Sequence, residues 1–139
     1  MIATVRRALV VSIALSGAVP NATGCADPFF EATTRLRDTR DTRGPYTVTT
    51  VAIGVEEGDR VELFYNVVDA EPENFIPLVM DAAEDDDAAF EGELFSRGIP
   101  GQRPGSDIRY YVAITRDSDT VAEDPEGGDL RPFVFSVLP

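Results

Sequence analysis

The chain has 139 residues and a formal net charge of -13, with 43% hydrophobic residues, 27% charged residues and one cysteine. This length allows one domain, and the apolar fraction is sufficient for a packed core, which excludes general disorder. The negative charge excludes nucleic-acid binding, because the phosphate contacts that supply most of that affinity would be repulsive.

The first 24 residues have the features of a bacterial signal peptide. Arg6 and Arg7 make a basic N-terminal region, and Ala8 to Val19 is an uncharged apolar run. A bilayer span needs about 20 apolar residues, so this run is too short to cross a membrane, but it suits the apolar region of a signal. We therefore predict that residues 1–24 form an N-terminal signal helix that directs export and is then removed.

The segment Ala22-Thr23-Gly24-Cys25 resembles the lipobox of bacterial lipoproteins, in which small residues precede a cysteine that is acylated and becomes the new N-terminus. Ala22 stands where that motif usually has Leu. An exported domain normally pairs its cysteines, so a single thiol needs an explanation, and lipidation of Cys25 supplies one. The resemblance implies acyl chains such as palmitate that hold the protein on a membrane.

The residue after the cysteine is Ala26 rather than Asp. In the lipoproteins that the segment resembles, Asp at this position retains the protein at the inner membrane, so the resemblance favours the outer membrane of the cell envelope. The alternative is cleavage without lipidation, which would leave a periplasmic or secreted protein with a dangling thiol.

After a tether expected over residues 25–34, short β-patterned runs alternate with clusters of Gly, Pro and Asp, and no helical period persists. Three runs alternate apolar and polar residues, as half-buried strands do. The residues expected to face the core are Val61, Leu63, Tyr65 and Val67 in the first run, Ile108, Tyr110, Val112 and Ile114 in the second, and Phe133, Phe135 and Val137 in the third. Phe64 does not fit this alternation.

Four further strands are predicted over residues 34–37, 46–53, 75–80 and 88–95, each bounded by turn residues. In the second of these, Val48 and Val51 cannot share a face by strict alternation, so either a bulge lies near Thr49 and Thr50 or both faces are partly covered. Pro77 indicates an edge strand, because proline lacks the N–H group that a central strand needs. Seven short strands predict an all-β sandwich over residues 35–139.

The stretch from Gly98 to Ser106, followed by Asp107 to Ala113, resembles the E-to-F corner and F strand of immunoglobulin-like, fibronectin type III-like modules in exported bacterial proteins. The stretch from Asp38 to Tyr46 is similar to the one that opens their B strand, and Pro132 to Val137 resembles their last strand. The resemblance implies a single antiparallel immunoglobulin-like β-sandwich, and it implies no particular activity, because such modules share a scaffold and not a site. By the same resemblance Tyr110 lies in a tyrosine corner, with its hydroxyl bonded to the backbone between Gly101 and Gly105.

The sequence contains no His and no Lys, which removes the commonest general base, the imidazole metal ligand and the Schiff-base amine. We therefore predict that the protein is not an enzyme and uses no cofactor. Calcium ligands are the remaining candidates: one acidic group contains Asp117, Asp119, Glu123 and Asp124, and another contains Asp81 with Glu84 to Asp87. Their spacing is not that of an EF-hand, since Val121 and Ala122 stand where Asp or Asn and then Gly are required, so acidic solvated loops are the favoured interpretation.

The sequence thus predicts a non-catalytic binding or structural module at the cell envelope, attached to the membrane through a lipid anchor, with an unidentified exported protein or glycan as its partner. The alternative is an unlipidated periplasmic or secreted accessory domain that binds another exported protein or a glycan. A glycan-binding sandwich would need a row of exposed aromatic side chains, for which Phe64 and Tyr111 are the candidates.

Overall fold

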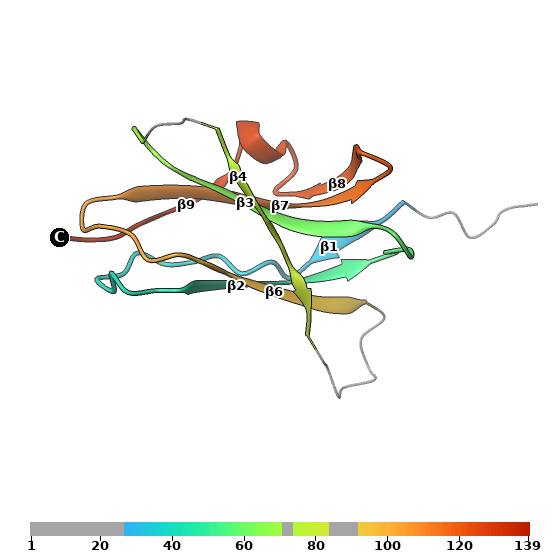
Figure 1. The fold of residues 1–139 in the computed structure, drawn as a ribbon, viewed down its shortest axis with the longest axis horizontal. Helices are drawn as coiled ribbons and strands as arrows, with labels where there is room; N and C mark the ends of the chain where they lie inside the picture. Colours follow the sequence, from blue (N-terminus) through green and yellow to red (C-terminus); the bar gives the residue numbers. More distant parts are fainter. Residues whose placement is uncertain (1–26, 71–73, 84–91) are drawn as a thin grey trace, which may run out of the picture.

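The computed structural model describes residues 27–70, 74–83 and 92–139, which form an immunoglobulin-like sandwich of two antiparallel sheets (Figure 1). One sheet has the strand order β1-β2-β6-β5, and the other has β4-β3-β7-β8, with β9 also paired to β7. The elements are β1 (Phe29–Glu31), β2 (Tyr46–Ile53), β3 (Arg60–Val67), β4 (Ile76–Val79), β5 (Asp81–Ala82), β6 (Glu93–Ile99), β7 (Asp107–Arg116), β8 (Asp119–Asp124), the short 3-10 helix η2 (Gly128–Leu130) and β9 (Phe133–Ser136). The predicted signal helix and Cys25 lie outside the described residues.

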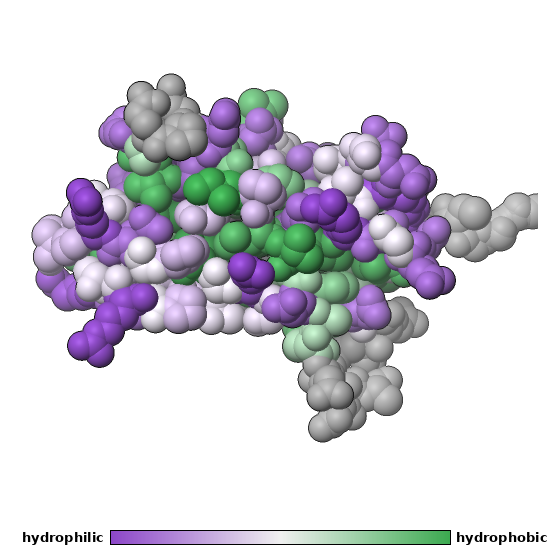
Figure 2. All heavy atoms as spheres, viewed as in Figure 1, coloured by the Kyte–Doolittle hydropathy of each residue, from purple (hydrophilic) through white to green (hydrophobic). Residues whose placement is uncertain are grey.

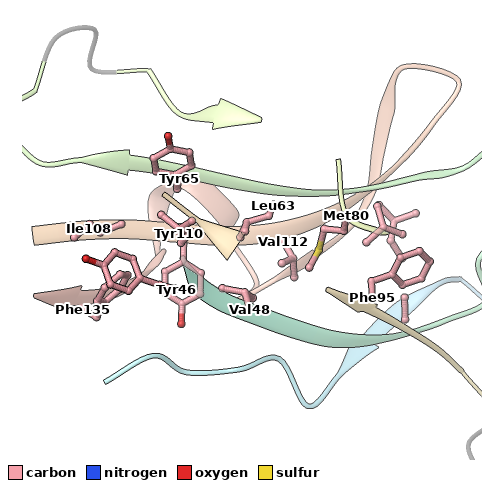
Figure 3. Close-up of a cluster of buried hydrophobic side chains, with 14 of the residues drawn as sticks. Tyr46, Val48, Leu63, Tyr65, Met80, Phe95, Ile108, Tyr110, Val112 and Phe135 are labelled. Carbon is pink, nitrogen blue, oxygen red and sulfur yellow. The ribbon is translucent and has the colours of Figure 1, made fainter. Parts of the chain in front are cut away.

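The alternation predicted for the three clearest strands is confirmed, and it places the core between the sheets. Ile108, Tyr110, Val112 and Ile114 of β7 are fully buried. Figure 3 shows the labelled side chains of β3 and β7 meeting those of β2, β6 and β9. The buried apolar residues are Tyr46, Val48, Ala52, Val61, Leu63, Tyr65, Met80, Phe95, Ile99, Ile108, Tyr110, Val112, Ile114, Phe135 and Val137.

Strand β2 pairs with β6 in an unbroken register from Tyr46 opposite Ile99 to Ala52 opposite Glu93, so there is no bulge near Thr49 and Thr50. Val48, Thr50 and Ala52 face the core, while Val51 is only partly covered on the other face. Partial cover of both faces, the second of the two predicted explanations, is therefore the correct one.

The first strand differs from the prediction. Residues 34–37 are not a strand, and β1 instead lies at Phe29–Glu31, within the segment expected to be a tether. After β1 the chain crosses from one sheet to the other: Thr34 bonds Thr49 of β2, and Thr39 then bonds Ser136 and Leu138 beside β9. Apolar and polar residues do not alternate regularly in this segment, because its first half pairs with one sheet and its second half with the other.

The acidic stretch predicted as a loop between the last two strands contains β8, which pairs with the second half of β7, while β9 pairs with the first half. The place beside β7 where one final strand was predicted is therefore occupied by two strands, β8 and β9, which are separated in the chain by η2. With the short β5, the described residues contain nine strands in place of the predicted seven.

Strands β4 and β5 form one continuous crossing between the sheets, visible in front of the other strands in Figure 1. β4 is an edge strand, as Pro77 predicts. Figure 2 shows hydrophobic residues in a band along this side of the sandwich, with hydrophilic residues gathered at both ends. No helix in the described part of the chain is long and apolar enough to span a membrane.

The hydroxyl of Tyr110 does not reach residues 101–105, so the predicted tyrosine corner is wrong in its partner. That hydroxyl donates to the Thr34 carbonyl at 2.8 Å and accepts from the Leu36 N–H at 2.8 Å. Tyr46 makes the tie to the loop after β6, because its hydroxyl donates to the Asp41 carbonyl at 2.6 Å and accepts from the Gln102 N–H at 3.2 Å.

Candidate binding surface on the five-stranded sheet

The outer face of the five-stranded sheet carries a cluster of three aromatic rings, here called the aromatic cluster: Phe64, Phe75 and Tyr111. Phe64 of β3 lies directly opposite Tyr111 of β7 in the strand register. Their rings stack with centroids 4.9 Å apart and an interplanar angle of 6°. Phe75, just before β4, places its ring at 71° to that of Tyr111 with centroids 5.1 Å apart. Phe64 breaks the apolar alternation of β3 because it belongs to this outer cluster.

One end of the aromatic cluster is polar and cationic. The Arg109 guanidinium lies over the Phe75 ring, 5.6 Å from its centroid. Its Nε donates to Oδ1 of the buried Asn66 at 3.0 Å. These contacts fix a positive charge against the ring, because a cation is attracted to the electron-rich face of an aromatic side chain.

The other end of the aromatic cluster is acidic. Gly128 of η2 is buried, and a Cβ placed on it would collide with the Glu123 carboxylate and lie 3.3 Å from Cε2 of Tyr111. Gly128 therefore permits the carboxylate and the ring to approach η2 from two sides. Burial raises the pKa of the Tyr111 hydroxyl, and the negative charges of Asp129, Glu123 and Glu62 raise it further.

Of these three carboxylates, Glu62 is already paired. It is 6% exposed, and it accepts hydrogen bonds from Arg60 at 3.1 Å and from the Thr115 hydroxyl at 3.4 Å. Glu123 and Asp129 are solvent-exposed and form no ion pair within the described ranges. They are the carboxylates at this end that an incoming group can reach.

Three exposed apolar side chains lie on the same sheet or on η2. Val79 at the edge is 49% exposed, and Val134 of β9, paired opposite Arg109, is 57% exposed. Leu130 of η2 is 83% exposed, and η2 lies on the outer side of this sheet in Figure 1. Phe64, Phe75 and Tyr111 are themselves half-buried, so part of each ring reaches the solvent on this face.

Sequence reasoning selected Phe64 and Tyr111, and the structure brings these two together. Sequence reasoning missed Phe75 and the charged residues at the two ends of the cluster. Which residues join the cluster depends on the register between strands and on the loop before β4. The one available signal was the outward position of Arg109 and Tyr111 on the same strand.

The calcium candidates do not form a centre. Asp117 lies in the turn after β7, Asp119 begins β8, and Glu123 and Asp124 end it. Because a strand rises about 3.3 Å per residue, the two ends of β8 are well separated. In the part of the chain that the structure describes, no three Cys, Asp or Glu residues are placed to hold a metal ion. Asp81 lies in β5, and Glu84 to Asp87 fall outside the described residues.

A separate hollow of about 360 Å³ lies at one end of the sandwich. It is lined by Val67, Val68, Asp69, Ala70, Gln102, Arg103 and Ser106. Gln102 already donates its side-chain amide to the Pro100 carbonyl at 2.9 Å. The hollow contains no aromatic ring, so the outer face of the five-stranded sheet is the stronger candidate surface.

No protein family and no curated protein matches this chain. Among solved structures, it is similar to the carbohydrate-binding module of the muscle glycogen-targeting subunit of protein phosphatase-1, with 12% identity and a TM-score of 0.47 over 79% of this chain and 76% of that one. It is also similar to a DUF4784 family protein from Bacteroides caccae, with 16% identity and a TM-score of 0.37 over 78% of this chain and 23% of that one. At these values the likeness concerns the fold and not a ligand.

Proposed function

We propose that this protein is a lipid-anchored, non-catalytic binding module of the bacterial cell envelope. In this proposal Cys25 carries the lipid, and the outer face of the five-stranded sheet is the binding surface. The observation that carries the binding role is the aromatic cluster, since aromatic side chains gathered on a solvent-facing sheet surface are typical of interaction sites.

The proposal of a non-catalytic role rests on residue chemistry. The sequence has neither His nor Lys, so the usual proton-transfer and amine nucleophile chemistry has no side chain to perform it. Acylation would remove the Cys25 thiol from any reaction. The groups on the outer face are then suited to recognising a partner rather than to transforming one.

Metabolic labelling with a fatty-acid probe tests the anchor. Wild-type protein expressed in a Gram-negative host should incorporate the probe and enter the detergent phase, because several acyl chains give slow membrane release. The Cys25→Ala variant should be unlabelled and soluble. Unlabelled wild-type protein that has lost its leader would instead support the unlipidated accessory domain and would exclude the anchor.

Glycan binding is a second candidate function, favoured by the aromatic cluster together with the Arg109 side chain beside it. Sugars bind aromatic side chains by stacking on an open ring face. Phe64 and Tyr111 each use one face on the other ring, which leaves less open ring area for a sugar. A glycan array probed with the full-length protein and with Phe64→Leu tests this candidate, which requires hits that the variant loses.

A further inference from the structure

We infer that the outer face of the five-stranded sheet docks a basic, arginine- or lysine-bearing segment of another exported protein. A cationic side chain of that segment would lie between the aromatic cluster and the carboxylates of Glu123 and Asp129. This inference rests on the proposed function and adds the chemistry of the partner to it.

The face has an unusual apolar content. The aromatic cluster, Val79 and Val134 give this face apolar area that a solvated sheet surface does not need. Isolated apolar residues on a surface are ordinary, but three rings in mutual contact on an outer sheet face indicate an interaction site. Hydrophobic contact alone would accept many partners, so the charges decide which partner is favoured.

The charge beside the rings is negative at the end next to η2. Glu123 and Asp129 stand at the acidic end of the cluster without an ion pair among the described residues, and their field reaches the Tyr111 hydroxyl. The whole chain has a net charge of -13. A negative protein raises the association rate of a positive partner and repels a negative one.

One cation of the chain already lies against a ring of the aromatic cluster. Arg109 stacks on Phe75, which shows that a guanidinium fits against a ring of the cluster. Arg109 occupies the end away from η2, and Arg60 pairs with Glu62. In the described ranges no arginine, Arg131 at the C-terminal end of η2 included, forms an ion pair with Glu123 or Asp129. The position beside these two carboxylates is therefore where a cation from outside can bind. An acidic partner would meet these two carboxylates and is disfavoured.

The test measures binding of a deca-arginine peptide to detergent-solubilised full-length protein by fluorescence anisotropy, at an ionic strength of about 0.15 M, where distant charges are screened. The double variant Glu123→Gln/Asp129→Asn removes the two carboxylates of the face. The matched control Glu31→Gln/Glu93→Gln makes the same change in net charge on the four-stranded sheet, where both carboxylates are exposed.

We expect the outer-face double variant to weaken binding about tenfold and the control to change it by less than about twofold, because close charge pairs and cation–π contacts act locally. Phe64→Leu should also weaken binding while keeping the urea midpoint near that of wild type. Arg109→Gln should strengthen binding by removing the resident cation, whereas the exposed Arg37→Gln should have less effect.

Equal weakening by the two double variants would show attraction to the overall charge and would overturn the inference. Wild-type protein that does not bind deca-arginine would also overturn it. Glycan-array hits lost in Phe64→Leu would then leave the proposed binding surface intact with a different partner. If wild-type protein binds neither the deca-arginine peptide nor any glycan on the array, the proposed binding surface is rejected as well.

Discussion

Arg116 holds Asp59 through two parallel hydrogen bonds, from Nε to Oδ1 at 2.9 Å and from Nη2 to Oδ2 at 2.7 Å. The Asp59 side chain is 2% exposed. It also accepts from the Glu56 N–H at 2.8 Å, and Arg116 donates to the Gly54 carbonyl at 3.3 Å. This pair therefore joins the turn between β2 and β3 to the end of β7.

The Asp59–Arg116 pair predicts a specific dependence of stability on pH. The hydrogen bond from Arg116 lowers the pKa of Asp59 from its ordinary value of 3.8, and burial opposes part of this effect. A carboxyl whose pKa is lower in the folded state than in the unfolded state stabilises the fold fully when the pH is above the unfolded-state pKa. This contribution is lost as the pH falls through the folded-state pKa. Asp59→Asn should therefore lower the melting temperature at neutral pH.

The measurement is the melting temperature of wild type and Asp59→Asn by circular dichroism across the pH range. The difference between the two proteins should be constant from about pH 7 to about pH 5 and should shrink as the pH falls below the ordinary value for Asp. Using the difference removes the effect of the other carboxylates. A difference that stayed constant into strong acid would show that the ionisation of Asp59 does not stabilise the fold.

Removal of one hydroxyl from the core should show how firmly the segment after β1 is held. Tyr110 is fully buried, and its hydroxyl bonds both Thr34 and Leu36. Tyr110→Phe should destabilise the domain by about 1–3 kcal/mol, because two backbone groups lose their partner. Urea unfolding followed by circular dichroism gives this value.

Tyr65→Phe is the matched control for that variant. Tyr65 is 8% exposed, and no hydrogen bond of its hydroxyl is seen in the described ranges. Its removal should change the free energy of unfolding by less than about 0.5 kcal/mol. Equal effects of the two substitutions would mean that the Thr34 and Leu36 bonds contribute nothing.

Close backbone approach makes Gly101 the glycine most sensitive to substitution. A Cβ on Gly101 would collide with the carbonyl oxygens of Thr42 and Arg43, which are backbone atoms and cannot rotate away. Gly101→Ala should cost at least about 3 kcal/mol, at the upper end of overpacking effects.

Gly58→Ala separates this collision from backbone strain. Gly58 has a φ of +93° with nothing within 4 Å of an added Cβ, so an alanine there suffers only the left-handed backbone cost of about 1–2 kcal/mol. Urea midpoints of the two variants make the comparison. A larger loss in Gly58→Ala than in Gly101→Ala would contradict the packing around Gly101.

Calcium should leave the melting temperature unchanged. Asp117, Asp119, Glu123 and Asp124 are distributed along the turn and strand β8 instead of converging, and calcium requires six to eight oxygen ligands around one point. The measurement compares melting in calcium chloride with melting in excess chelator. A higher midpoint in calcium that is lost in the Asp117→Asn/Asp119→Asn variant would identify a site after all.

The strands that sequence reasoning located best are those with one buried face. β2, β3, β7 and β9 alternate because one side meets the core, and the inward residues of β3, β7 and β9 were identified correctly. β8 was taken as a loop because Asp119–Asp124 is mostly polar. Its place in the sheet depends on pairing with β7, and Val121 and Ala122 are its two residues that pack against the core. β1 was missed because three residues are too few to establish an alternation.

Only part of the candidate surface could be predicted from the sequence, for a related reason. Phe64 and Tyr111 could be marked as outward aromatic residues, but their stacking follows from the register between β3 and β7. The partners of the Tyr110 hydroxyl are 74 and 76 residues away along the chain. Contacts of this range depend on how the sheets close over each other, which local patterns do not encode.

The three-residue pairing of β1 with β2 has a mechanical consequence. A tensile load applied at residue 27 would act first on Phe29, Phe30 and Glu31, whose register with Ile53, Ala52 and Val51 is short. These pairs would unzip one after another, since each is loaded only when the previous pair has opened. The next resistance is the hydroxyl contact between Thr33 and Thr50, followed by the Thr34–Thr49 contact. The leading segment would therefore extend under load while the remaining sandwich keeps its shape.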